Sequence, residues 1–195
     1  MEDKILEIMK NNNDIITPSK LEKAGISRVY LYNMEKDGLI EKIDRGIYVT
    51  KEFIYDEYYL FQFKYPKTIF SHNTALYFNN MTERTPINMD VTICREYNPH
   101  RFKDLVNIYK VSKEIFDLGV VERKSPQGMD IKTYNLERTI CDIIKDKNSL
   151  DIETRNKVIR KCIKSKEFNS NLMFEYAKKL KVYEKVKIYM EAIIW

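Results

Sequence analysis

The sequence predicts an α+β protein of two domains, a small amino-terminal one over residues 1–50 and a larger one over residues 51–195. In the first fifty residues, three short helical patterns precede two strand-like runs that are joined by a glycine turn. Between about residues 66 and 134, short apolar runs alternate with turn signals, which is typical of a β-sheet. From about residue 135 onward, apolar residues recur at helical spacing, so the chain is expected to end in a helical bundle.

The composition is that of a globular protein that stays in the cytosol. Of 195 residues, 44% are hydrophobic and 32% are charged, and the many aromatic residues argue against disorder. No apolar run approaches the roughly 18 residues of a membrane span, and the amino terminus has no signal-peptide core. The scattered Cys94, Cys141 and Cys162 are expected to be reduced thiols. Because neither they nor His72 and His100 have metal-ligand spacing, no metal and no cofactor is expected.

Two helices and a short strand are expected at the start of the chain. The first helix, residues 3–10, carries an apolar stripe and ends at the Asn-rich run 11–14, whose side chains compete for backbone hydrogen bonds. Residues 15–16 form a short apolar strand. Thr17 then caps a second helix over residues 18–24, which has a proline in its first turn.

A turn, a third helix and a hairpin complete the amino-terminal domain. Residues 25–27 (Gly-Ile-Ser) form the turn, and a helix over residues 28–38 that ends at Gly38 follows it. Two strands over residues 39–43 and 47–49 flank a tight Asp-Arg-Gly turn. Three helices, a glycine turn and a hairpin in this order predict a winged helix-turn-helix, which is a DNA-binding module.

The outward face of the third helix carries side chains that suit a DNA major groove. Arginine can donate two hydrogen bonds to guanine, asparagine can pair with adenine, and lysine can neutralise a phosphate. Arg28, Asn33 and Lys36 share this face, and Arg45 stands at the tip of the hairpin. The expected DNA-binding residues are Thr17, Ser19, Lys20, Ser27, Arg28, Val29, Tyr32, Asn33, Lys36 and Arg45.

Two other interpretations of this domain stay open. An exposed arginine or lysine on a helix is often only a solvated residue. Winged helices also bind other proteins, and residues 1–50 have a net charge of −1. The domain therefore lacks the basic footprint of many DNA-binding domains.

The larger domain is expected to begin with an aromatic helix over residues 51–65 whose rings pack in the core. A mostly antiparallel sheet should follow over about 66–134, interrupted by a helix over 72–81 that Ser71 caps. The bundle helices are expected over residues 136–145, 152–164, 170–180 and 183–194.

Most of the excess positive charge lies in the last 45 residues, which have a net charge of +5 against +1 for residues 51–150. This basic region is interpreted as an ordinary solvated surface, as a second contact with DNA, or as a surface for an acidic partner. The candidate residues for such a contact are Arg155, Arg160, Lys161, Lys164, Lys178, Lys179, Lys181 and Lys185.

A catalytic interpretation is weaker. Asp117, Asp130 and Lys132 loosely match the carboxylates and lysine of a metal-dependent nuclease. Alternating charges on the exposed face of a strand account for the last two equally well. Charge pairing at helical spacing accounts for the polar residues of 137–142. We therefore expect no enzymatic activity and no catalytic residues.

Segments of both domains carry a family resemblance. In the first domain they are the turn at 25–27 with its helix, and Asp37-Gly38-Leu39-Ile40 leading into Arg45-Gly46-Ile47-Tyr48. In the larger domain they are 70–76 (FSHNTAL) and 134–142 (YNLERTICD). With these segments, most of the chain resembles the AbiEi family, the antitoxins of the AbiE abortive-infection toxin–antitoxin systems of type IV.

The resemblance implies a function beyond what spacing indicates. AbiEi antitoxins bind inverted repeats upstream of their own operon through a winged helix and repress it. Through the carboxy-terminal domain they counter a separately encoded nucleotidyltransferase-like toxin, without a stable complex, and so limit phage spread. The resemblance places the DNA contacts on Arg28, Tyr32, Asn33, Lys36 and Arg45. It is compatible with a monomer in solution and two copies on the inverted repeat.

The leading hypothesis is thus a cytoplasmic antitoxin that is also the repressor of its own operon. The first alternative is a winged-helix transcription factor whose carboxy-terminal domain senses a ligand or a partner. The second alternative is a metal-dependent nuclease.

Overall fold

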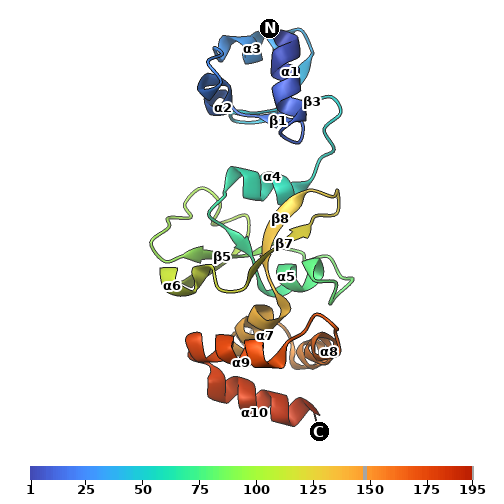
Figure 1. Cartoon of the computed structure of the whole chain (residues 1–195), viewed down its shortest axis with the longest axis vertical. Coiled ribbons are helices and arrows are strands. Elements are labelled where there is room, and N and C mark those ends of the chain that lie inside the picture. The colour runs from blue at the N-terminus through green and yellow to red at the C-terminus, as the bar shows by residue number, and fades with distance from the viewer. Residues whose placement is uncertain (147–148, 195) are drawn as a thin grey trace. The chain divides into compact units, whose positions relative to one another are not determined.

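Residues 51–56 form neither a helix nor a strand, and they join two units of the chain (Figure 1). The computed structural model describes residues 1–146 and 149–194. The first unit comprises Met1–Tyr55, and the second begins at Asp56.

The aromatic helix expected over residues 51–65 is shorter than predicted. It is α4 (Glu57–Lys64), and it begins where the Asp56 carboxylate accepts a hydrogen bond from the Tyr59 amide at 3.0 Å. An aspartate that satisfies a first-turn N–H marks a helix start, and the preceding residues have no comparable cap.

The first unit contains three helices and a three-stranded sheet, and all of its residues are described. Its strands are antiparallel in the order β1-β3-β2. The elements follow the expected sequence order, with bounds α1 (Glu2–Lys10), β1 (Ile15–Ile16), α2 (Pro18–Lys23), α3 (Val29–Lys36), β2 (Ile40–Asp44) and β3 (Ile47–Thr50).

Apolar side chains at helical spacing form the core of the first unit. A spacing of three or four residues places them on one face of each helix. The buried helical residues are Ile5, Met9, Leu21, Leu31 and Met34. Gly25 (φ +74°) and Gly38 (φ +69°) follow α2 and α3 in the left-handed conformation that ends many helices.

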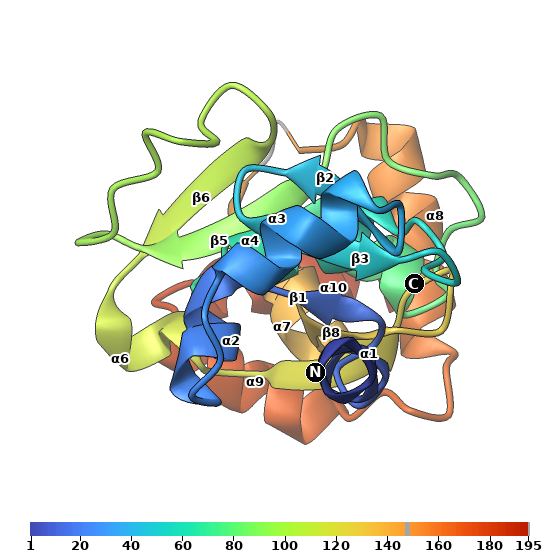
Figure 2. The same cartoon turned by 90° about the horizontal axis from the view of Figure 1, so that it is seen from above.

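The sheet of the second unit has five described strands in the order β6-β5-β4-β8-β7. Figure 2 shows β5 and β6 lying side by side. The strands are β4 (Ile69–Phe70), β5 (Asp90–Cys94), β6 (Asn107–Val111), β7 (Val120–Lys124) and β8 (Asp130–Tyr134).

The expectation of a mostly antiparallel sheet is wrong. The pairs β4–β5 and β7–β8 are antiparallel, but β5–β6 and β4–β8 are parallel. Parallel neighbours need a connection of about a dozen residues or more. Residues 95–106 supply it between β5 and β6, and most of the sheet-forming segment lies between β4 and β8.

Helices cover both sides of this sheet. In Figure 1, α4 lies on one side, and α7, α9 and α10 lie on the other. None of the helices within 1–146 and 149–194 is long and apolar enough to cross a membrane. The helices after α4 are α5 (His72–Phe78), α6 (Lys113–Phe116), α7 (Leu136–Lys145), α8 (Ile152–Ile163), α9 (Ser170–Lys179) and α10 (Tyr183–Ile194).

Two apolar clusters hold the second unit together. Aromatic rings fill the cluster beside α4, where the Tyr58 ring meets the Phe70 and Phe78 rings edge-on at centroid distances of 5.7 and 5.0 Å. Edge-on packing is a favoured geometry for aromatic pairs. The other cluster joins the last four helices through buried residues such as Ile140, Ile159, Met173 and Val186.

Candidate functional site

The exposed face of α3 is the candidate nucleic-acid interface of the first unit. Because Leu31 and Met34 are buried, the residues around them on the helix point to solvent. Val29 is 59% exposed and Tyr32 is 65% exposed. Exposed apolar side chains that gather on one helix mark an interaction surface. The polar residues exposed with them are Arg28, Asn33 and Lys36.

Ser27 organises the start of α3. Its Oγ accepts a hydrogen bond from the Val29 amide at 3.3 Å, and its carbonyl accepts one from the Tyr30 amide at 3.2 Å. Arg28 follows with helical backbone angles. These bonds fix the direction in which α3 leaves the turn, and they leave Ser27 and Arg28 exposed.

Arg45 lies exposed in the turn between β2 and β3. The strand register shifts between Lys42 and Asp44, and Gly46 adopts a φ of +73°. The Asp44 carboxylate accepts a hydrogen bond from the Arg45 amide at 2.6 Å. Lys42 is also exposed, with its Nζ 5.9 Å from the centroid of the Tyr48 ring. Lys42 is a cation on this hairpin that the sequence analysis missed, although its place on the first strand was predicted.

The predicted site residues of α2 differ in accessibility. Thr17 is half-buried, and its hydroxyl caps the helix by accepting a hydrogen bond from the Lys20 amide at 3.3 Å. Ser19 and Lys20 are exposed, and the Lys20 ammonium donates a hydrogen bond to the Asn12 side chain. Nine of the ten predicted residues are therefore exposed within one unit, and Thr17 has a structural role.

The basic residues of the last helices do not form the single exposed set that was predicted. Arg155 is only 6% exposed, so its inclusion in an exposed contact surface is wrong. The physical reason lies in its spacing, since the buried residues Ile159 and Cys162 follow it by four and seven residues on the same side of α8. The Lys161 ammonium donates to the Asn80 carbonyl at 3.0 Å. The exposed candidates are Arg160, Lys161, Lys164, Lys178, Lys179, Lys181 and Lys185.

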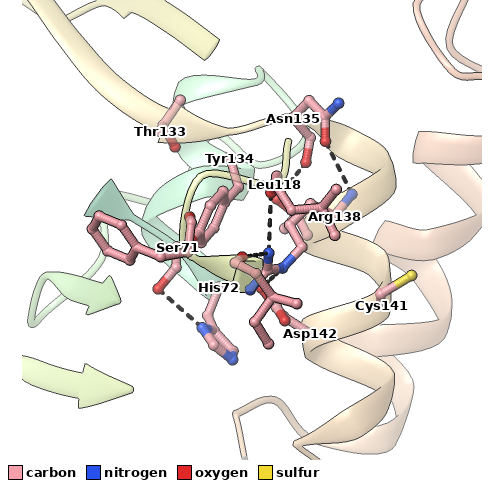
Figure 3. A network of polar contacts seen from close by, with 12 residues as sticks. Ser71, His72, Leu118, Thr133, Tyr134, Asn135, Arg138, Cys141 and Asp142 are labelled. Atoms are coloured by element: carbon pink, nitrogen blue, oxygen red, sulfur yellow. Dashed lines mark hydrogen bonds and ion pairs between the residues drawn. The ribbon is translucent and has the colours of Figure 1, made fainter. Parts of the chain in front are cut away.

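Arg138 is the centre of a buried polar network in the second unit (Figure 3). Its side chain is fully buried, and its Nε donates to the Asp142 carboxylate at 2.9 Å. One terminal nitrogen donates to the carbonyls of Ile115 and Leu118 at 2.7 and 3.0 Å. The guanidinium carbon lies 4.3 Å from the centroid of the Tyr134 ring. The network ties α7 to the α6–β7 connection, so these residues of the 134–142 segment hold the fold together.

His72 is buried beside this network in a conformation unusual for its residue type. Its φ is +46°, and its Nδ1 lies within hydrogen-bond distance, 3.1 Å, of the Ser71 Oγ. Its ring stacks on the Tyr109 ring at a centroid distance of 3.5 Å. Burial, followed by the charges of Arg138 and Lys145, lowers the pKa of His72 to about 3. His72 is therefore neutral at pH 7. The Ser71 hydroxyl accordingly bonds to this ring, and no hydrogen bond from it caps α5.

Asp90 on β5 forms hydrogen bonds with residues of the neighbouring strand β6 and of helix α5. Its carboxylate accepts hydrogen bonds from the Asn107 side chain at 2.8 Å and from the Asn73 amide at 2.9 Å. Its own amide donates to the Thr74 hydroxyl at 2.8 Å. Burial raises the pKa of Asp90 despite these bonds. This cluster was not predicted, because residues distant in the sequence form it.

Two of the three residues considered for a nuclease, Asp130 and Lys132, lie on the exposed face of strand β8. Asp130 forms an ion pair with Lys124 directly across the β7–β8 ladder at 2.7 Å, and both side chains are more than 60% exposed. Lys132 lies opposite Glu122 in the same ladder. Asp117 lies elsewhere, at the end of α6. Within the described ranges, no group of three or more His, Cys, Asp or Glu is arranged to hold a metal ion.

A comparison with protein families finds a match within the first unit. Residues 3–51 match the model of the family described as "Transcriptional regulator, AbiEi antitoxin". The match confirms, over that segment, the resemblance seen in the sequence, and it supports a role as an antitoxin or transcriptional regulator. No curated protein matches the chain.

The whole chain is similar in fold to a solved structure, the crystal structure of the RV2827C protein from Mycobacterium tuberculosis. The superposition covers 98% of this chain and 79% of that chain, with a TM-score of 0.53. The sequence identity is 9%, so the likeness concerns the fold alone.

Proposed function

We propose that this chain, whose residues 3–51 match the AbiEi antitoxin family model, is a repressor that binds operator DNA through a winged helix-turn-helix. The observation that carries the proposal is the exposed face of α3. It combines two cations and an amide with the largely exposed side chains of Val29 and Tyr32. The two apolar side chains offer packing against the apolar parts of the bases, such as the thymine methyl group.

In this proposal α3 enters the major groove. Arg28 and Asn33 contact base edges, because their side chains can each form two hydrogen bonds with one base. Val29 packs on a thymine methyl group, and Lys36 neutralises a phosphate near the end of the helix. Arg45 reaches a phosphate or the minor groove from the hairpin. Ser19, Lys20 and Ser27 position the protein on the DNA backbone, and Thr17 supports them by capping α2.

The net charge of the first unit bears on how it would bind. Residues 1–50 have a net charge of −1, so general attraction to DNA is weak. Binding then depends on a few cations at fixed positions and on base contacts. Such a protein should discriminate strongly between its operator and other DNA.

The second unit carries the antitoxin activity in this proposal. It counters a nucleotidyltransferase-like toxin without a stable complex, as part of a defence against phage, and two copies of the chain occupy an inverted repeat. The basic residues of α8, α9 and α10 that remain exposed, such as Arg160 and Lys179, are a second contact with DNA or with an acidic partner.

A two-readout assay tests this division between the units. Cells carry the toxin gene and a reporter under the DNA upstream of the antitoxin gene. The Arg28→Ala variant should lose repression of the reporter and keep rescue from the toxin, whereas Lys4→Ala, an exposed cation on α1, should keep both. Loss of rescue by a folded Arg28→Ala protein would contradict the division, and retained repression would contradict DNA contact by α3.

A further inference from the structure

A pocket of about 410 Å³ lies between α8 and α10 in the second unit. Ile144 at the end of α7 contributes to its lining. Ile152 and Ile188 line it from α8 and α10, and they are 70% and 65% exposed. Arg155 and Lys185 add two cations from the same two helices. The pocket thus combines apolar walls with positive charge.

Arg155 is the unusual residue of this pocket. It is only 6% exposed, and its Nε is buried with no hydrogen-bond partner in the described part of the chain. No ion pair with a described carboxylate compensates its charge. Arg138 also has one buried terminal nitrogen without a partner, but its Nε donates to the Asp142 carboxylate and its other terminal nitrogen donates to two carbonyls. A buried N–H without a hydrogen-bond partner is costly to the folded state, and an acceptor bound in the pocket would satisfy it.

A hydrogen bond joins the two helices that line the pocket. The Tyr189 hydroxyl on α10 donates a hydrogen bond to the Asn156 side chain on α8. The pKa of Tyr189 is raised by burial and lowered in part by Arg155, which places the arginine close to this ring. Arg155 therefore sits in a formed site, and little rearrangement is needed for a ligand to reach it.

We infer that this pocket binds the carboxylate of a small amphipathic acid, such as a medium-chain fatty acid or an aromatic acid. The planar guanidinium of Arg155 matches a carboxylate with two parallel hydrogen bonds, and Lys185 adds a second charge. Ile144, Ile152 and Ile188 cover the apolar body of the ligand. The volume lies in the range of small-molecule sites, which is about 300–1,000 Å³. A polyphosphate does not suit these apolar walls.

The inference goes beyond DNA binding and does not depend on it. It gives the second unit a ligand of defined chemistry, whichever role the first unit has. The test therefore uses the full-length protein without DNA.

Calorimetric titration with decanoate below its micelle concentration is the test, with 1-decanol and acetate as matched ligands. Decanoate should bind saturably. Both 1-decanol, which lacks the carboxylate, and acetate, which lacks the long apolar chain, should bind at least about tenfold more weakly. The Arg155→Met variant should lose at least about tenfold in decanoate affinity. The Lys157→Met variant, which changes an exposed cation of the same helix that lies outside the pocket lining, should bind like the wild type.

Thermal unfolding of the variants separates ligand binding from a structural role. Arg155→Met should be at least as stable as the wild type without ligand, because methionine removes a buried charge that has no partner. Decanoate should raise the Tm of the wild type and leave that of Arg155→Met unchanged. Should Arg155→Met fail to fold, Lys185→Met, at an exposed position, should still weaken decanoate binding severalfold.

Three results would overturn the inference. Equal affinity for decanoate and 1-decanol would show that the pocket does not select a carboxylate. Unchanged decanoate affinity in both Arg155→Met and Lys185→Met would place the binding elsewhere. Absence of decanoate binding together with binding of an acidic peptide would assign the groove to a protein partner.

Discussion

Arg138 and Asp142 form a buried ion pair one helical turn apart on α7, with the Arg138 Nε 2.9 Å from a carboxylate oxygen of Asp142. The same guanidinium donates to two carbonyls outside the helix. The polar residues Arg138 and Asp142 of the 134–142 segment therefore stabilise the fold. Charges that resemble a catalytic group in the sequence instead anchor α7 beside the sheet.

Breaking this pair on one side should destabilise the second unit strongly. Arg138→Met leaves the Asp142 carboxylate buried without its partner, and we expect a loss of about 3–5 kcal/mol in the free energy of unfolding. Lys124→Ala breaks an exposed ion pair with Asp130 and should cost less than about 1 kcal/mol. Urea denaturation of the two variants measures both values, and equal losses would refute the structural role of Arg138.

Gly119 should tolerate no side chain. Its φ is +81°, and an added Cβ would lie 2.8 Å from both the Arg138 Cβ and the Asn135 Oδ1. Gly119→Ala combines backbone strain with overpacking and should cost about 2–4 kcal/mol. Gly128→Ala is the matched control, because its φ is +83° and no atom lies within 4 Å of an added Cβ. It should cost only about 1–2 kcal/mol in thermal or urea unfolding, and a similar loss for both would show that packing around Gly119 is looser than described.

His72 should make stability depend on pH. Burial lowers its pKa to about 3, and the unfolded value is about 6.5. Between these values the unfolded chain binds a proton that the folded chain does not, so acidification favours unfolding. From pH 6.5 downward, His72 should reduce the free energy of unfolding by up to about 1.4 kcal/mol per pH unit.

The His72→Asn variant isolates this contribution. Asparagine tolerates a positive φ and does not titrate, so the variant should lose part of the acid sensitivity. His100→Asn changes an exposed histidine and should keep the wild-type slope. Urea unfolding across this pH window compares the three proteins, and a His72→Asn slope as steep as that of the wild type would assign the effect to other groups.

Much of the local structure was predictable, because it depends on spacing within one segment. The periodic helices α7 and α10 have the predicted bounds, and Gly25 and Gly38 end their helices as expected. The parallel strand pairs were not predictable, since alternation within a strand does not reveal the direction of its neighbour. The four-residue helix α6 is too short to show a period.

Some features of the candidate sites were likewise predictable from the sequence, and others were not. The exposed face of α3 follows from the burial of Leu31 and Met34, which the sequence indicates. The burial of Arg155 was predictable from Ile159 and Cys162, which follow it at helical spacing, but its charge favoured a place on the surface. The cluster around Asp90 brings together residues far apart in the chain, so it emerges only in the folded structure.

Salt dependence should identify the phosphate contacts of the first unit. Removal of one contact reduces the slope of log K against log salt concentration by about 0.9 on duplex DNA. Lys36→Ala should show this reduction on operator DNA and on unrelated DNA, and Lys4→Ala should show none. A slope that Lys36→Ala leaves unchanged would remove Lys36 from the interface.

The most direct test of the central claim is a gel-shift titration of the purified protein against the DNA upstream of its own gene, beside a scrambled duplex, at two salt concentrations. We expect tight binding to the upstream DNA and much weaker binding to the scrambled duplex, with this selectivity retained at the higher salt. Equal, weak binding to both duplexes that disappears at the higher salt would contradict sequence recognition by α3. In that case the basic carboxy-terminal helices would be responsible for DNA binding.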